Sequence, residues 1–173
     1  MPPRIFLIGF MGAGKTTLGR AAAARLGWPF ADLDEAIEAA AGSSIAGLFA
    51  GQGEAAFRQL ERRTLESLAS SLPEPSILSL GGGAPCYFPD TMSWLAAYGR
   101  TVYLRVSPQA LAERLRPYKA ARPLLRDVPD EQLPDFIDTL LQEREKAYLQ
   151  AAVILQGDRL QPEDLIGVLE FEF

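Results

Sequence analysis

The residues that decide the fold are Ile5-Phe6-Leu7-Ile8-Gly9-Phe10-Met11-Gly12-Ala13-Gly14-Lys15-Thr16. Ile5 to Phe10 is a short apolar run without alternation, as is typical of a strand buried on both faces of a parallel sheet. A glycine-rich turn follows it, and apolar residues then recur at helical spacing from Lys15 to Leu26. A strand, a turn and a helix in this order predict an α/β fold, with the turn at the carboxyl edge of the sheet.

Gly9 to Thr16 also form the pattern G-x-x-x-x-G-K-T, the Walker A phosphate loop, between the strand and helix that it requires. Its glycines let backbone N–H groups point at phosphate oxygens, and the positive dipole end of the helix lies there too. Lys15 can reach the β- and γ-phosphates, and the Thr16 hydroxyl can ligate Mg²⁺. We therefore expect a nucleoside triphosphate with Mg²⁺, the alternative being a glycine-rich turn without a ligand. The expected contacts in the loop are Gly12, Ala13, Gly14, Lys15, Thr16 and Thr17.

Four further strands are expected downstream, at residues 30–33, 76–80, 101–106 and 152–155. Strands that alternate with helices predict a three-layer α/β/α sandwich around a five-stranded parallel sheet. Because the chain has 173 residues and no evident linker, we expect a single domain over residues 1–173. Ligands of such sheets bind beyond the carboxyl ends of the strands, so the residues after each strand are the candidates for the site.

The composition excludes several catalytic classes, because the chain has no histidine, no asparagine and one cysteine, Cys86. No imidazole is available for serine or cysteine catalysis or for a metal site, and no intramolecular disulfide can form. GTPase switches that recognise guanine with an Asn-Lys-x-Asp motif are excluded as well. Since motors and larger ATPases generally need a longer chain, a small-molecule kinase is the leading class.

The formal net charge is −5, which makes nucleic acid an unsuitable partner. No stretch approaches the ~18 apolar residues of a membrane span. The apolar run that ends at Phe10 leads into glycines and a lysine rather than into a signal-peptide cleavage site. We therefore expect a cytoplasmic protein without a nucleic-acid or membrane partner. No long apolar surface stripe argues for an oligomer, and a monomer is expected.

Asp32-Leu33-Asp34 ends the second expected strand. Residues i and i+2 of a strand point the same way, so both carboxylates are expected to face the phosphate loop. One can hold the metal through water, and the other can orient or deprotonate an attacking hydroxyl. Asp32 is the natural metal partner, because the third strand has no acidic residue. The alternative is that both carboxylates cap the next helix.

Three further features suggest an acceptor and a lid. Gly81-Gly82-Gly83 follows the third strand and would let a polar ligand approach closely, unless it is only a flexible turn. Arg58 lies near the start of a helix and could grip a carboxylate, unless it is a solvated surface residue. A basic segment over about residues 114–127 would form a mobile lid above the phosphates, or else a solvated loop. Its cations are Arg114, Arg116, Lys119, Arg122 and Arg126.

Taken in chain order, these motifs resemble those of the shikimate kinases, which are P-loop NTPases of the nucleoside-monophosphate-kinase type. The resemblance runs from Ile5 to about Leu155. It rests on Gly9–Thr16, Asp32–Asp34, Gly53-Glu54-x-x-Phe57-Arg58-x-x-Glu61, Gly81–Gly83, Arg122-Pro123-Leu124-Leu125 and Arg144-x-x-x-Tyr148. It implies ATP-dependent, in-line phosphorylation of the 3-hydroxyl of shikimate with Mg²⁺, in aromatic amino acid biosynthesis.

The resemblance also implies roles for individual residues. Asp34 would bind the ring hydroxyls of shikimate and assist the attacking one, within an acceptor-binding region of about residues 33–61. Arg58 and Arg144 would hold the carboxylate, and Gly81–Gly83 would line the same pocket. Asp32 would order the water shell of Mg²⁺ beside Thr16.

On the nucleotide side, the resemblance assigns Arg122 to the transferring phosphate. Lys15, Asp34 and Arg122 are thus the expected catalytic residues. Arg116 is a further expected ATP contact, and Arg159 is expected near the adenine. Two alternatives remain: a kinase of gluconate or another small polyol acid, and a nucleotide-dependent regulatory or binding protein without an acceptor. The second leaves Asp34, Arg58 and Arg144 unexplained.

Overall fold

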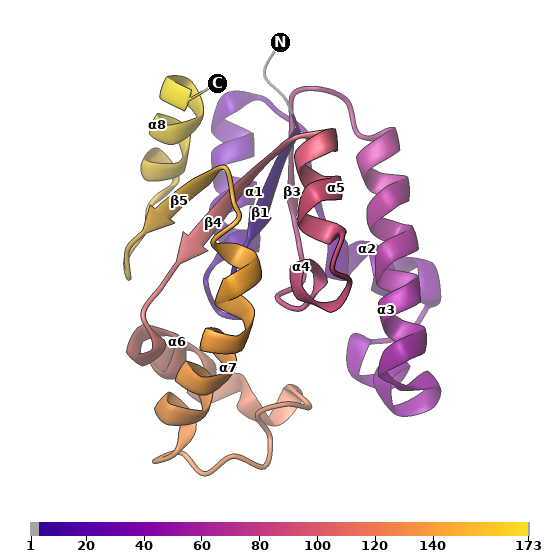
Figure 1. The fold of residues 1–173 in the computed structure, drawn as a ribbon, viewed down its shortest axis with the longest axis vertical. Helices are drawn as coiled ribbons and strands as arrows, with labels where there is room; N and C mark the ends of the chain where they lie inside the picture. Colours follow the sequence, from indigo (N-terminus) through magenta and orange to yellow (C-terminus); the bar gives the residue numbers. More distant parts are fainter. Residues whose placement is uncertain (1–3, 173) are drawn as a thin grey trace.

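A parallel sheet of five strands forms the centre of the computed structural model, which describes residues 4–172 (Figure 1). The strand order is β2-β3-β1-β4-β5, and every neighbouring pair is parallel. The strands are β1 Arg4–Ile8, β2 Phe30–Asp32, β3 Ser76–Ser79, β4 Arg100–Arg105 and β5 Val153–Gln156. The expected five-stranded α/β fold is confirmed.

Helices connect the strands and cover the sheet, with α1 and α8 packed together on one side and α5 and α7 on the other (Figure 1). The helices are α1 Lys15–Leu26, α2 Leu33–Ala41, α3 Ile45–Ser71, α4 Ala84–Tyr87, α5 Thr91–Tyr98, α6 Pro108–Leu115, the 3-10 helix η1 Arg116–Ala121, α7 Leu133–Tyr148 and α8 Pro162–Glu172. No helix in this described part of the chain is long and apolar enough to cross a membrane.

The central strand β1 decides where the site lies. Its residues Ile5 to Ile8 are fully buried, because β3 and β4 flank the strand and helices cover both faces. This explains the apolar run without alternation. The loop that leaves β1 therefore starts at the middle of the carboxyl edge, between the ends of β3 and β4.

Two elements were not expected from the sequence. The short helix α4 directly follows the glycine triplet, and η1 lies inside the expected lid. Both are too short to show a helical repeat of apolar residues, and η1 has no buried residue. Residues 1–3 and 173, the ends of the expected single domain, lie outside the described residues.

Candidate active site

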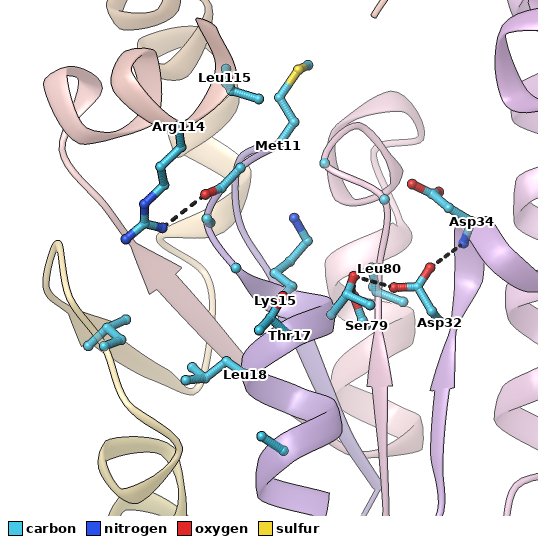
Figure 2. Close-up of a pocket in the computed structure, with 18 of the residues that line it drawn as sticks. Met11, Lys15, Thr17, Leu18, Asp32, Asp34, Ser79, Leu80, Arg114 and Leu115 are labelled. Atoms are coloured by element: carbon cyan, nitrogen blue, oxygen red, sulfur yellow. Dashed lines mark hydrogen bonds between the residues drawn. The ribbon is translucent and has the colours of Figure 1, made fainter. Parts of the chain in front are cut away.

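A cavity of about 810 Å³ lies at the carboxyl edge of the sheet, over the phosphate loop (Figure 2). Its lining brings together eleven of the residues expected from the sequence: Gly12, Ala13, Gly14, Lys15, Thr16, Thr17, Asp32, Asp34, Gly81, Gly82 and Arg122. Five other expected residues lie outside this lining: Arg58, Gly83, Arg116, Arg144 and Arg159. Residues from the phosphate loop, the start of α2, the glycine triplet and the lid thus converge on one cavity.

The phosphate loop has the backbone that its glycines predict. Gly12 and Gly14 both have positive φ, 79° and 93°, and Gly14 precedes the first residue of α1. A side chain is strained in this conformation. The turn therefore depends on glycine at both positions, and it directs the amino end of α1 at the cavity.

Lys15 is the first residue of α1, and its ammonium group is nearly enclosed by protein. Its Nζ donates hydrogen bonds to the carbonyl oxygens of Gly9 at 2.8 Å and Phe10 at 3.0 Å. Burial lowers the pKa of Lys15 to about 8, although the carboxylates of Asp34 and Asp32 oppose this change. A cation that is held by two neutral carbonyls and lines the cavity is well placed to bind an anion.

Asp32 connects α1, β2 and α2. Its Oδ2 accepts a hydrogen bond from the Thr16 hydroxyl at 2.6 Å, and its Oδ1 accepts one from the backbone N–H of Asp34 at 3.0 Å. The Ser79 hydroxyl at the end of β3 lies 3.4 Å from the Thr16 hydroxyl. Figure 2 shows Asp32 and Ser79 beside the amino end of α1.

The expectation that Asp32 and Asp34 point the same way along one strand was wrong. β2 ends at Asp32, and Asp34 lies in the first turn of α2. The alternative, that both carboxylates cap the next helix, is correct for Asp32 alone. Asp32 is the N-cap of α2 and also accepts a hydrogen bond from the N–H of Glu35. An aspartate can satisfy the free N–H groups of a helix start, and this outweighs continuing the strand. Both carboxylates nevertheless line the cavity.

The site changes the pKa of the Asp34 carboxyl. Burial raises the pKa of Asp34, and the neighbouring Asp32 raises it further, whereas the charges of Lys15 and Arg122 lower it. A carboxylate with a raised pKa is a better proton acceptor than an ordinary aspartate. Its charge interactions with Lys15 and Arg122 place it between the phosphate loop and the lid.

Each residue of the glycine triplet lies against a charged side chain from another element. A Cβ on Gly81 would lie 2.8 Å from Oδ1 of Asp34. A Cβ on Gly82 would lie 3.5 Å from Nη1 of Arg144, and one on Gly83 would overlap the guanidinium of Arg58. The triplet is therefore a close-packed wall that Asp34, Arg58 and Arg144 share, which disfavours the alternative of a flexible turn.

Arg58 is not a solvated surface residue. Only 7% of it is exposed, and its Nη1 donates to Oε2 of Glu61 at 2.8 Å. Glu61 is itself buried, and its burial raises its pKa against the opposing charge of Arg58. No role was assigned to Glu61 from the sequence. Its position three residues after Arg58, on the same helix face, was the signal that could have revealed the pair.

The lid contributes Arg122 and also Arg114, a cation of the expected lid that had no individual contact assigned to it. The Arg122 Nε is one of two buried side-chain nitrogen or oxygen atoms that have no hydrogen-bond partner among the described residues. Arg114 in α6 donates from Nη1 to the Gly12 carbonyl at 3.0 Å and from Nη2 to the Asp158 carbonyl. Figure 2 shows the first of these bonds.

Arg116 and Arg159 do not reach the cavity over the phosphate loop. Arg116 is exposed, because two residues along a helix correspond to a rotation of about 200° and Arg114 takes the side that faces the loop. Arg159 is exposed too and lines a neighbouring cavity of about 580 Å³, to which Arg114 also contributes. Their role as ATP contacts stays a prediction.

Comparison with known proteins identifies the family. Residues 11–170 match the family model described as shikimate kinase. The chain belongs to the shikimate kinase family. The shikimate kinase of Bacteroides thetaiotaomicron is 46% identical over 158 residues, which cover 91% of this chain and 89% of the relative. The family resemblance expected from the sequence is confirmed.

Solved structures of the shikimate kinase family agree with this assignment. A crystal structure of shikimate kinase from Bacteroides thetaiotaomicron superposes with a TM-score of 0.87 at 44% identity, covering 97% of this chain and 96% of that one. The shikimate kinase from Acinetobacter baumannii, solved in complex with shikimate, superposes with a TM-score of 0.86 at 32% identity and covers 98% and 92%. The fold is thus that of the shikimate kinases.

Proposed function

We propose that this chain transfers the γ-phosphoryl group of ATP to the 3-hydroxyl of shikimate. Phosphorylation of shikimate with ATP as co-substrate, in aromatic biosynthesis, is the activity of its family. The observation that carries the proposal is the convergence of Lys15, Asp34 and Arg122 on one cavity at the end of the central strand. These residues supply the charge that phosphoryl transfer needs and a carboxylate for the acceptor.

On the phosphate side, the backbone N–H groups of residues 12–17 and the Lys15 ammonium would hold the β- and γ-phosphates. The Arg122 Nε, which has no partner among the described residues, would donate to the transferring group. In-line transfer through a loose transition state is accelerated mainly by positioning and by such positive charge. Closure of the lid would also exclude water, which otherwise competes as the acceptor.

The oxygen atoms beside α1 fit Mg²⁺. Thr16 and Asp32 offer a hydroxyl and a carboxylate at one point, and the described part of the chain holds no cluster of three or more metal-ligating Asp, Glu, Cys or His residues. A small ligand set suits Mg²⁺, which keeps several waters and binds phosphates. Thr16 would bind the ion directly and Asp32 through water. When bound, the ion would neutralise phosphate charge.

On the acceptor side, Asp34 would accept a hydrogen bond from the attacking hydroxyl and take its proton. Arg144 and the remaining N–H groups of Arg58 would hold the carboxylate of shikimate against the glycine triplet. The chain has no histidine, so Asp34, whose pKa is raised, would act as the general base. A weak base suits a loose transition state, which needs little prior deprotonation.

A coupled assay of ADP release tests this proposal. We expect rapid ADP release with shikimate and only slow release without an acceptor. Gluconate at the same concentration is the control for a kinase of another polyol acid. Equal rates with the two acids would contradict the choice of acceptor, whereas ADP binding without any acceptor-dependent turnover would favour a regulatory protein.

We further propose that the chain acts as a single-domain monomer in the cytoplasm. All residues assigned above belong to one chain, so the site needs no partner subunit, and the co-substrate ATP is abundant in that compartment. Light scattering coupled to size exclusion should give one chain per particle. A dimer would contradict this part of the proposal and leave the assigned chemistry unchanged.

A further inference from the structure

Tyr148, the last residue of α7, connects α7 to the glycine triplet. Its ring is fully buried and packs against the ring of Tyr103, with 5.1 Å between the centroids. Its hydroxyl donates a hydrogen bond to the carbonyl oxygen of Gly82. A buried tyrosine hydroxyl usually finds a partner, but this partner is the middle residue of the wall assigned to the acceptor.

Arg144 lies one helical turn before Tyr148, so the two side chains leave α7 on the same face. Nη1 of Arg144 lies 3.5 Å from the point that a Cβ on Gly82 would occupy. Burial raises the pKa of Tyr148, and the charge of the Arg144 guanidinium opposes this change. The hydroxyl therefore stays protonated at neutral pH, and it donates that proton to the carbonyl oxygen of Gly82.

A second contact ties the same two elements together. The Cys86 thiol in α4 lies 3.8 Å from the carbonyl oxygen of Arg144. Because α4 directly follows the glycine triplet, the end of α7 is attached to this segment both by the Tyr148 side chain and by the Arg144 backbone. Figure 1 shows α4 beside α7, in agreement with their contacts.

We propose that Tyr148 is a positioning residue for the acceptor carboxylate: its hydrogen bond to the Gly82 carbonyl fixes the glycine triplet relative to α7 and so to the Arg144 guanidinium. This inference rests on the proposed function, because it takes the acceptor to be a hydroxy acid that Arg144 holds. Tyr148 does not line the cavity, but its hydrogen-bond partner Gly82 does, so it acts through Gly82 and the neighbouring Arg144. Its hydroxyl should therefore affect the affinity for the acid and not the affinity for ATP.

Tyr148→Phe removes the hydroxyl and keeps the buried ring. We expect the KM for shikimate to rise about fivefold, as for the loss of one hydrogen bond, with kcat and the KM for ATP within about twofold of the parent. Tyr103→Phe is the matched control, because its hydroxyl belongs to the other ring of the pair and donates to Glu145 at 3.1 Å. Its KM for shikimate should stay within about twofold of the parent.

A shikimate analogue with a hydroxymethyl group in place of the carboxylate separates this role from a general loss of structure. If Tyr148 acts through Arg144, the parent and Tyr148→Phe should bind the analogue equally, measured as dissociation constants by calorimetry. For each variant, the dissociation constant of shikimate is divided by that of the analogue. This ratio does not depend on how much of the variant is folded, because misfolded protein affects both constants equally.

Three results would overturn the inference: an unchanged KM for shikimate, an equal loss of affinity for ATP, or an equal loss for the analogue. The proposed function fails in a different way. If the parent chain shows no shikimate-dependent ADP release, both proposals are wrong. If the parent is active and Tyr148→Phe behaves like the parent, only the role of Tyr148 is wrong.

Discussion

Lys15 shows how a single residue can make nucleotide binding depend on pH. Its ammonium donates to two carbonyls, but its burial lowers the pKa of Lys15 to about 8 in the empty protein. The phosphates of a nucleotide would favour the charged form, because opposite charge raises the pKa of a lysine. A nucleotide therefore binds the protonated form of Lys15 more tightly than the neutral form.

We expect the affinity for ADP to fall as the pH rises above about 8, because the empty protein has then lost the Lys15 proton that binding must restore. Isothermal calorimetry from pH 7 to pH 10 measures this. Lys15→Arg is the matched control, since a guanidinium keeps its charge throughout this range. A parent protein whose affinity is flat across pH 8 would contradict the assignment of Lys15.

The folded state has the lower Lys15 pKa, so between pH 8 and 10.5 the unfolded chain binds more protons at this residue. The contribution of Lys15 to the free energy of unfolding of the empty protein should therefore increase with pH in this window. Urea unfolding of the parent and of Lys15→Met should show the increase in the parent alone.

A substitution at Gly81 tests whether a side chain can be tolerated in the glycine triplet. Its φ is not positive, so alanine causes no backbone strain there, but its Cβ would crowd Asp34 and Glu61. We expect Gly81→Ala to lower kcat/KM for shikimate at least about tenfold and to leave ADP affinity unchanged. Gly51→Ala is the control, because a Cβ there meets nothing within 4 Å. Parent-like turnover of Gly81→Ala would show that Asp34 has room to move.

At the scale of the helix, Asp32 has two separable roles, as the N-cap of α2 and as the partner of Thr16. Asp32→Ala should lower the free energy of unfolding by about 1 kcal/mol through the lost cap. Asp32→Asn should be nearly as stable as the parent, because asparagine also caps helices well. The asparagine side chain lacks the negative charge that is expected to face Mg²⁺. Thermal unfolding and the Mg²⁺ concentration for half-maximal activity measure the two roles.

Ser44→Ala is the control for the cap alone, since the Ser44 hydroxyl accepts from the N–H of Gly47 at the start of α3. It should lose a similar stability and keep the parent's Mg²⁺ requirement. If Asp32→Asn also needs no more Mg²⁺ than the parent, Asp32 has only a structural role.

The end of α6 predicts different roles for two neighbouring arginines, Arg114 in its last turn and Arg116 directly after it. Arg114 donates to the Gly12 carbonyl of the phosphate loop, whereas Arg116 is exposed and outside the cavity. We expect Arg114→Ala to raise the KM for ATP about tenfold and Arg116→Ala to change it less than about twofold. Steady-state kinetics at saturating shikimate measure both. The reverse order would mean that the lid rotates α6 when the nucleotide binds.

At the scale of the whole molecule, local patterns predicted the elements, and contacts between elements decided the details. The phosphate loop and β1 were predictable because a buried strand and a glycine pattern are local signals. The cap at Asp32 was missed because a strand and a helix start compete for the same two residues. The choice between Arg114 and Arg116 depended on the angle of α6 to the loop, which no local pattern contains.

The Arg58–Glu61 pair and the Tyr148–Gly82 bond were harder to foresee. Both residues of the first pair were visible in the motif, but an i,i+3 pair on a helix is usually exposed, and only the packing of α3 buries this one. The second joins residues 66 positions apart in the chain. Such a bond follows from the packing of the end of α7 against α4, the helix that directly follows the glycine triplet.

The contacts of the glycine triplet restrict how this protein can change over time or under laboratory selection. Gly81 and Asp34 occupy adjoining space, as do Gly83 and Arg58, so the amino acids tolerated at one position depend on its neighbour. A larger residue in the triplet would be accommodated only after its charged neighbour becomes smaller, and the smaller neighbour would abolish the chemistry. Libraries that vary the acceptor preference should therefore change each glycine together with its neighbour, because single steps lead through inactive intermediates.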